Sequence, residues 1–105
     1  MTDEPTSPPT VAQILEGCLG CKWTLHVLGQ IRLGVHRPGR LEQTADGLTG
    51  KVLNERLAKL RRFGMISRTD FGETPPRVEY RLTDFGEKVA GLLDQIEELE
   101  GGRAL

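Results

Sequence analysis

The chain has 105 residues, enough for one domain with a single hydrophobic core but not for two. Its 37% hydrophobic and 28% charged residues are typical of a soluble globular protein, and the formal net charge of -1 excludes the charge imbalance of a disordered chain. No stretch approaches the roughly 20 apolar residues of a membrane-spanning helix, and residues 1–10 lack the basic and then apolar order of a signal peptide. We therefore predict a cytoplasmic protein with no membrane partner.

The small net charge hides a segregated distribution. Residues 1–31 have a net charge of -2 and residues 83–105 one of -4, whereas residues 63–82 are balanced. Residues 32–62 carry eight lysines and arginines against three acids, a net charge of +5. Such a basic middle can attract phosphate locally while the whole chain stays soluble.

The N-terminal third predicts an arm and two helices. Residues 1–9 are rich in proline, threonine, serine and acids, which predicts a disordered arm. Thr10 and Gln13 have the spacing of a capping box, and predict a short first helix that nearby glycines help end. Apolar residues at helical spacing predict a second helix over residues 21–33, with Pro38-Gly39 as a breaker after it.

The middle third predicts a short helix followed by a clear one. Residues 40–46 have a weak helical pattern, which Gly47 interrupts. Thr49 can cap the next helix, which ends in two arginines with Gly64 as the left-handed stop. Its apolar stripe consists of Val52, Leu53, Leu57 and Leu60.

The last third predicts a hairpin and a helix. Residues 65–71 and 77–82 alternate with period two on either side of a Pro-Pro turn, which predicts two paired strands. Thr83 can cap a final amphipathic helix, and residues 101–105 predict a flexible C-terminus. This order of elements predicts an α+β, mostly helical fold: a winged helix-turn-helix domain over residues 10–100 with an extra C-terminal dimerisation helix.

Three segments carry a resemblance to a known family. They read Gly-Cys-Lys-Trp-Thr-Leu over residues 20–25, Gly-Leu-Thr-Gly-Lys-Val-Leu-Asn-Glu-Arg-Leu over residues 47–57, and Pro-Pro-Arg-Val-Glu-Tyr-Arg-Leu-Thr-Asp-Phe-Gly over residues 75–86. In order and spacing they resemble the HxlR family of bacterial transcription regulators. The resemblance implies a DNA-binding homodimer whose terminal helices form the dimer core and present two recognition helices to the half-sites of a pseudo-palindrome.

One departure from the family concerns sensing. Many members carry a Cys-Pro pair thirteen positions ahead of the tryptophan, and some use that cysteine to sense oxidants or electrophiles. Here Thr10 and Val11 hold the matching positions. That role is therefore not carried over to this chain.

The capped helix after Thr49 is the candidate recognition helix. Lys51 and Asn54 are the expected base readers, because lysine donates to guanine and asparagine bonds adenine in two places. Thr49 and the Gly50 amide suit a phosphate at the helix start. The alternative is the ordinary solvated face that any surface helix shows.

Four arginines are candidate DNA-backbone contacts. Arg37, Arg40 and Arg56 could clamp phosphates in a salt-dependent, sequence-independent way. Arg77, beside the turn of the hairpin, could reach a minor groove or its phosphates. The alternatives are solvated arginines and, for Arg77, pairing with Glu73 or Glu79.

The last helix has a wider apolar stripe than the rest of the domain covers easily. We therefore predict a homodimer interface there, with packing on the first two helices as the alternative. The stripe consists of Val89, Leu92, Leu93, Ile96 and Leu99.

Cys18 and Cys21 are close in sequence and can be interpreted in three ways. Near a helix start and beside Lys22 they could form a redox pair. Their apolar neighbours favour buried structural cysteines, and a zinc site with His26 and His36 would have no standard spacing.

Together these features predict a sequence-specific regulator of transcription without cofactor or metal, which binds double-stranded DNA as a homodimer and represses by blocking a promoter. A small molecule or an oxidant could act as its effector. The alternatives are a thiol redox protein using Cys18 and Cys21, and a winged helix retained for protein interaction. A catalytic function is not predicted, because the sequence has no Gly-rich phosphate loop, paired-carboxylate cleft or Ser/His/Asp set.

Overall fold

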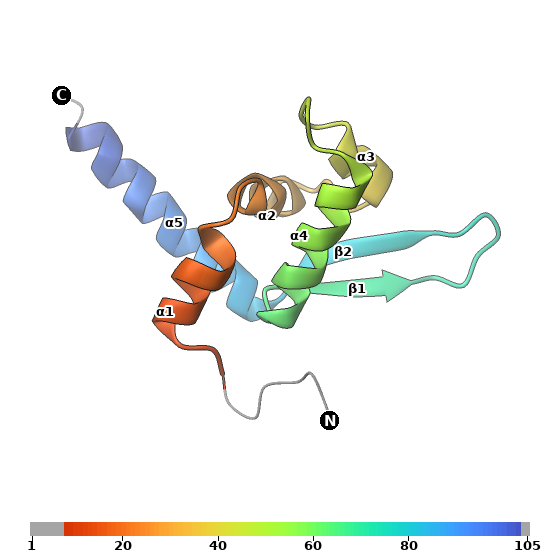
Figure 1. Cartoon of the computed structure of the whole chain (residues 1–105), viewed down its shortest axis with the longest axis horizontal. Coiled ribbons are helices and arrows are strands. Elements are labelled where there is room, and N and C mark those ends of the chain that lie inside the picture. The colour runs from red at the N-terminus through yellow and green to blue at the C-terminus, as the bar shows by residue number, and fades with distance from the viewer. Residues whose placement is uncertain (1–7, 104–105) are drawn as a thin grey trace.

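The computed structural model describes residues 8–103, which fold into five α-helices, one π-helical turn and a two-stranded sheet. In chain order the elements are α1 (Val11–Ile14), the π-helical turn η1 (Leu15–Leu19), α2 (Thr24–Arg32), α3 (Pro38–Glu42), α4 (Gly50–Arg62), β1 (Ile66–Asp70), β2 (Val78–Leu82) and α5 (Asp84–Arg103). This is the predicted winged helix-turn-helix with a further C-terminal helix. The hairpin projects from one end of the molecule and the C-terminal half of α5 from the other (Figure 1).

One hydrophobic core joins these elements, and α2 lies at its centre. The helix packs against α3, α4, α5 and β2, so its apolar residues are covered from several sides. The predicted stripes of α2 and α4 supply most of the core, because residues three and four apart share a helix face. Its largest fully buried side chains are Leu28, Ile31, Leu41, Leu53, Leu57, Leu60 and Met65.

Two helix starts differ from the prediction, whereas the first helix ends at the second of the glycines expected to end it. The first helix continues past Gly17 as η1 and ends at Gly20. The next begins at Thr24 rather than residue 21, because Trp23 adopts a left-handed conformation with φ 76° and serves as N-cap. Pro38 is no breaker: it occupies the first turn of α3, where its fixed φ suits a helix and its missing N–H is not needed.

The hairpin is an antiparallel pair in which Ile66 faces Leu82 and Asp70 faces Val78. One further bond, from the Phe71 amide to the Arg77 carbonyl at 3.0 Å, extends the pairing toward the turn. The amide of Tyr80 donates to the His36 carbonyl at 2.8 Å, which joins the hairpin to the segment before α3. The wing is therefore held beside the helix-turn-helix.

A hydrogen-bonded junction docks α5 on the turn after α4. The Thr83 hydroxyl donates to the Gly64 carbonyl at 2.6 Å and accepts from the Gly86 amide at 3.0 Å, which confirms the predicted cap. The backbone passes so close that a Cβ on Gly86 would overlap the Met65 carbonyl. The Leu-Thr-x-x-Gly segment thus fixes where the last helix leaves the hairpin.

Parts of the two predicted chain ends lie outside residues 8–103. Most of the predicted arm, residues 1–7, and the last two residues are not described. The segment 101–105, expected to be a flexible C-terminus, includes the last residues of α5, which ends at Arg103. None of the helices within residues 8–103 combines the length and apolar character that a bilayer crossing requires.

Candidate nucleic-acid interface

The outer face of α4 is polar and exposed along its whole length. Leu53, Leu57 and Leu60 point into the core, whereas Lys51 and Asn54 are exposed on the opposite side. Arg62 is also exposed and follows Lys51 at i+11, so the two lie on one face about three turns apart. Arg62 was not among the predicted contacts, although the same helical periodicity identifies it.

The start of α4 is capped and also faces a carboxylate. The Thr49 hydroxyl accepts from the Val52 amide at 3.2 Å, as the capping pattern predicted. The Glu42 carboxylate of α3 lies beside Gly50: a Cβ built on this glycine would be 3.4 Å from the nearest carboxylate oxygen. A phosphate at the Gly50 amide would therefore meet this negative charge. Glu42 had no signal in the sequence, because only the fold brings α3 to the start of α4.

Arg56 is half-buried and held against the protein surface by two contacts. Its Nε donates to the Lys22 carbonyl at 2.6 Å, and its Nη1 lies 3.8 Å from the Glu55 carboxylate. Only 20% of its side chain is exposed. The arginine thus ties α4 to the segment before α2, and its geometry favours a structural role over the expected phosphate clamp.

Arg37, Arg40 and Arg77 line one recess between α3 and the hairpin, although 40 residues of sequence separate the first and the last. The recess has a volume of about 520 Å³. Arg37 and Arg40 are exposed, so their guanidinium groups can meet an anion. A second hollow of about 320 Å³, also lined by Arg37 and Arg40, extends toward Arg81.

Arg77 pairs with Glu73 and Glu79, which was one of the two alternatives that the sequence left open. Its Nε lies 3.2 Å from the Glu73 carboxylate and 4.0 Å from that of Glu79. Its guanidinium also stacks on Phe71, 3.8 Å from the ring centroid. These contacts hold the turn of the wing in shape and leave about a third of the side chain exposed.

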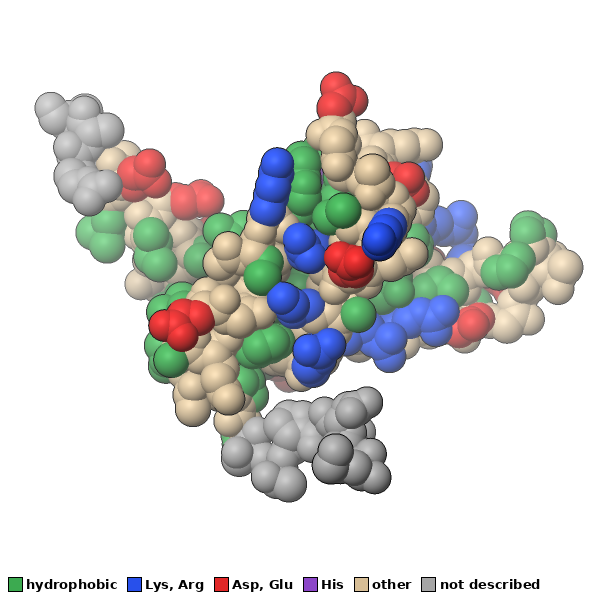
Figure 2. Space-filling view, in the orientation of Figure 1, with side chains coloured by type: hydrophobic (Ala, Val, Ile, Leu, Met, Phe, Trp, Pro, Cys, Tyr) green, Lys and Arg blue, Asp and Glu red, His purple; other side chains and the backbone are tan. Residues whose placement is uncertain are grey.

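Basic side chains gather on the face that carries α4 and the near edge of the hairpin (Figure 2). The exposed members include Lys51, Arg61 and Arg62 on α4 and Arg68 on β1. Arg68 was not among the predicted contacts. This surface corresponds to the positively charged block of the sequence and continues it onto the hairpin.

The predicted dimer stripe on α5 divides into two faces. Val89 is only 8% exposed and Leu93 packs partly buried beside it, so both belong to the core of their own subunit. Leu92, Ile96 and Leu99 are 59%, 58% and 73% exposed. These three are the members of the stripe that the domain leaves uncovered, whereas Val89 and Leu93 pack within it; the dimer interface stays a prediction.

The two cysteines lie beside α4. Cys18 is fully buried, and this burial raises the pKa of its thiol from 9.0 to about 11. Cys21 is half-buried, and the Lys59 ammonium of α4 donates to its sulfur at 3.2 Å. His26 pairs instead with the Thr44 hydroxyl at 2.8 Å, and no group of three or more metal-binding side chains occurs within residues 8–103.

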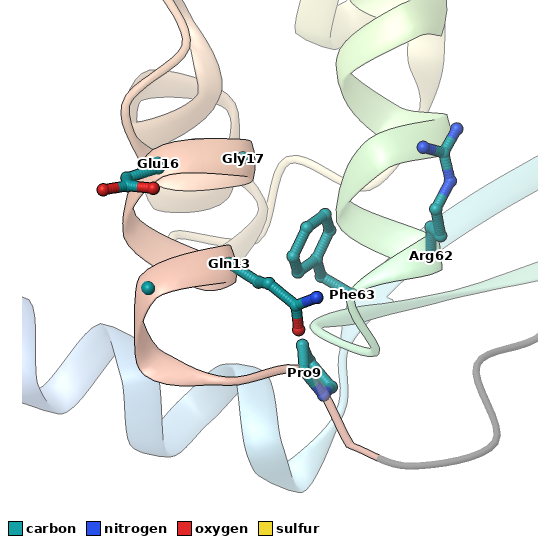
Figure 3. Close-up of a pocket in the computed structure, with 7 residues that line it drawn as sticks. Pro9, Gln13, Glu16, Gly17, Arg62 and Phe63 are labelled. Atoms are coloured by element: carbon teal, nitrogen blue, oxygen red, sulfur yellow. The ribbon is translucent and has the colours of Figure 1, made fainter.

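A cavity of about 490 Å³ lies between the first helix and the end of α4 (Figure 3). Phe63, the C-cap of α4, points into it opposite Gln13 and Gly17, and Pro9 closes its lower end. Its volume is in the range of small-molecule sites. No local sequence pattern indicates this cavity, because its walls come from segments about 50 residues apart.

Comparison with known proteins agrees with this geometry. A family model described as HxlR-like helix-turn-helix matches residues 18–103. The chain is 32% identical over 78 residues to the uncharacterized HTH-type transcriptional regulator YtcD of Bacillus subtilis, a match that covers 74% of this chain and 62% of that protein. It is 36% identical over 80 residues to YvaP of the same organism, another uncharacterized HTH-type transcriptional regulator, covering 76% and 74%.

Among solved structures, a protein described as a transcriptional regulator of the MarR family from Enterococcus faecalis V583 superposes with a TM-score of 0.82 at 30% identity, covering 98% of this chain and 94% of that one. These relatives are named as regulators of transcription and not as enzymes, in agreement with the predicted non-catalytic function. The chain therefore belongs to the HxlR-like helix-turn-helix family of transcriptional regulators.

Proposed function

We propose that this protein is a repressor that binds a specific double-stranded DNA sequence as a homodimer and blocks a promoter by occupying it. The observation that carries this proposal is the exposed polar face of α4, next to a recess lined by three arginines. Family membership and the positively charged block of the sequence support it.

Base recognition is assigned to α4, because an α-helix fits the major groove of DNA. Lys51 and Asn54 stand three residues apart near the start of the helix, and so point to the same side. Lysine donates to the acceptors of guanine, and the asparagine amide matches the donor and acceptor of adenine. Both are exposed, and Lys51 forms no ion pair among residues 8–103.

Backbone contacts are assigned on both sides of α4. Arg37 and Arg40 line the recess toward the wing, and Arg62 lies at the other end of the helix. Thr49 keeps its hydroxyl proton to donate, because its oxygen is the atom that caps the helix. The stacked and paired Arg77 acts by shaping the wing, with its exposed part beside the phosphates.

Dimerisation is assigned to the exposed face of α5. Leu92, Ile96 and Leu99 lie on one side of a helix whose C-terminal half projects away from the domain (Figure 1). A second copy would cover this apolar stripe and place two recognition helices about a two-fold axis. The operator is then pseudo-palindromic.

The test is the double substitution Lys51→Ala with Asn54→Ala. We expect its affinity for the duplex selected by the unsubstituted chain to fall by about 30-fold or more, because each of the two base contacts contributes about 1–3 kcal/mol of discrimination and about 1.4 kcal/mol is a factor of ten. Lys88→Ala removes an exposed lysine from α5 and serves as the control for net charge. Equal affinity of the double variant and the control would refute the recognition-helix assignment and favour a protein-interaction module.

A further inference from the structure

Two cysteines and a lysine form a cluster that DNA recognition does not use. The Cys21 amide donates to the Cys18 carbonyl at 3.1 Å, so the segment between them makes a tight turn. Gly20 permits this turn, because a Cβ there would lie 2.9 Å from the Leu15 carbonyl oxygen. Lys59 of α4 reaches the same place and donates to the Cys21 sulfur at 3.2 Å.

From this arrangement we propose that Cys18 and Cys21 are an oxidation site for hydroperoxides, which converts the two thiols to a disulfide within one chain and weakens the attachment of Lys59 on α4. The turn allows the bond, because residues i and i+3 of a hydrogen-bonded turn have Cα atoms less than about 7 Å apart. A disulfide spans Cα distances of about 4.4–6.8 Å.

Exposure and charge separate the roles of the two cysteines. Cys21 is half-buried, so a small peroxide reaches it, and the Lys59 ammonium stabilises negative charge on its sulfur during the attack. Cys18 is fully buried, and its raised pKa of about 11 keeps it a thiol at neutral pH. Cys21 is therefore the sulfur that meets the peroxide, and Cys18 the one that resolves the product.

The reaction balances with the peroxide as the only oxidant. The Cys21 sulfur attacks one peroxide oxygen, the O–O bond breaks, and an alcohol or water leaves, so that Cys21 becomes a sulfenic acid. The Cys18 sulfur then attacks the Cys21 sulfur, an S–S bond forms, and water leaves with the Cys18 proton. Two thiols lose two electrons in total, and the peroxide gains them.

The consequence for α4 rests on the proposed function. Disulfide formation converts the Cys21 sulfur from a thiol, which can carry negative charge, into a neutral and weakly accepting sulfur, so the contact from Lys59 is lost as a charge-stabilising one. The lysine is half-buried and has no ion pair among the described residues, so this step removes the polar partner that the structure gives its ammonium. Lys59 shares α4 with Lys51 and Asn54, so a shift there changes the base-reading face. We expect the oxidised protein to bind its DNA at least about fivefold more weakly, the lower end of typical coupling between sites.

Formation of the disulfide between Cys18 and Cys21 is tested without DNA. The full chain is treated with hydrogen peroxide, and we expect an intact mass lower by two hydrogen atoms, a Cys18–Cys21 peptide in a digest, and no covalent dimer on a non-reducing gel. In Cys21→Ser we expect Cys18 to react slower by about tenfold or more, because it is buried. In Cys18→Ala we expect Cys21 to stop at a sulfenic acid that dimedone traps.

The role of Lys59 is tested by the rate at which hydrogen peroxide oxidises the cysteines. Lys59→Gln should oxidise several times more slowly, whereas Lys59→Arg keeps the charge and Lys88→Gln serves as a distant control. Circular dichroism verifies that each variant is folded. Three results would overturn the site as proposed. The first is that both thiols stay intact at a peroxide dose that oxidises glutathione, and the second is a disulfide between chains. The third is an equal oxidation rate in Lys59→Gln and in the unsubstituted chain.

The coupling half compares DNA affinity before and after oxidation, with dithiothreitol to reverse it. A disulfide that forms while affinity stays the same overturns the link to α4. If the reduced protein selects no DNA, the proposed function fails, while the mass and rate measurements still decide the oxidation site.

Discussion

Gly86 has no room for a side chain, because a Cβ there would overlap the Met65 carbonyl. Gly86→Ala must push α5 away from the turn after α4. We expect the free energy of unfolding to fall by about 1–3 kcal/mol, the usual cost of overpacking. Urea unfolding followed by circular dichroism measures this change.

The matched control is Gly91→Ala in the same helix. A Cβ at Gly91 meets nothing within 4 Å, and alanine is favoured over glycine in a helix interior. We expect stability to rise by about 0.5–1 kcal/mol. Equal destabilisation by both substitutions would contradict the steric explanation for Gly86.

Cys18 gives the protein a pH-dependent stability. The unfolded thiol loses its proton near pH 9.0, whereas the folded one keeps it to about pH 11. Between these values the unfolded state is the one that releases a proton, so stability is fully present below the window and falls as the pH rises through it. Urea unfolding is measured below pH 9 and between pH 9 and about pH 11. The free energy of unfolding should fall less between these two conditions in Cys18→Ala than in the unsubstituted chain.

Sequence periodicity predicted which side chains of α4 are exposed, but not what the half-buried ones touch. Arg56 bonds the Lys22 carbonyl and Glu42 faces Gly50. These partners come from other elements, so the local pattern contains no trace of them. For Arg77 the sequence indicated Glu73 and Glu79 as partners, but it did not decide between pairing with them and contacting DNA.

At the scale of elements, α4 combines residues that we propose to read DNA with residues that hold the fold. Arg56→Ala should lower the free energy of unfolding by about 1.5–3 kcal/mol, because it removes a charged hydrogen bond. It should leave the slope of log affinity against log salt nearly unchanged. Arg62→Ala should instead lower that slope by about 1 and preserve stability.

Salt titrations of DNA binding and urea unfolding of both variants check this division. The opposite pattern, in which Arg56→Ala changes the slope and Arg62→Ala the stability, would mean that Arg56 contacts phosphate after all.

The elements with strong signals were predicted most accurately. Thr49 and Thr83 cap α4 and α5 as their spacing indicates, and the strands pair within a residue of the expected positions. Weak patterns gave wrong boundaries. The pair Pro38-Gly39 predicts a break in the chain, but proline fits the first turn of a helix equally well. The left-handed Trp23 has no sequence signature.

The whole molecule leaves an apolar stripe uncovered. Ile96→Glu places a charge among Leu92 and Leu99, and we expect the chain to sediment as a monomer at concentrations where the unsubstituted chain is a dimer. Glu98→Gln, which lies on the opposite side of α5, is the control. A dimer that persists in Ile96→Glu would place the interface elsewhere.

Sequence alone predicted the stripe but not its division. Val89 and Leu93 follow the same periodicity as Ile96, and only the docking of α5 on α2 shows which of them the domain covers. Arg32 fixes this docking with an ion pair to Asp94 at 2.6 Å.

The central claim is that α4 and α5 together make a dimer that reads one DNA sequence. The most direct measurement is selection from a pool of random duplexes with the full chain, followed by the affinity and stoichiometry of the enriched site at two salt concentrations. We predict a pseudo-palindrome bound by two chains, with an affinity that falls steeply as salt rises. A pool that shows no enrichment, or an affinity equal for the enriched and scrambled duplexes, would contradict the claim.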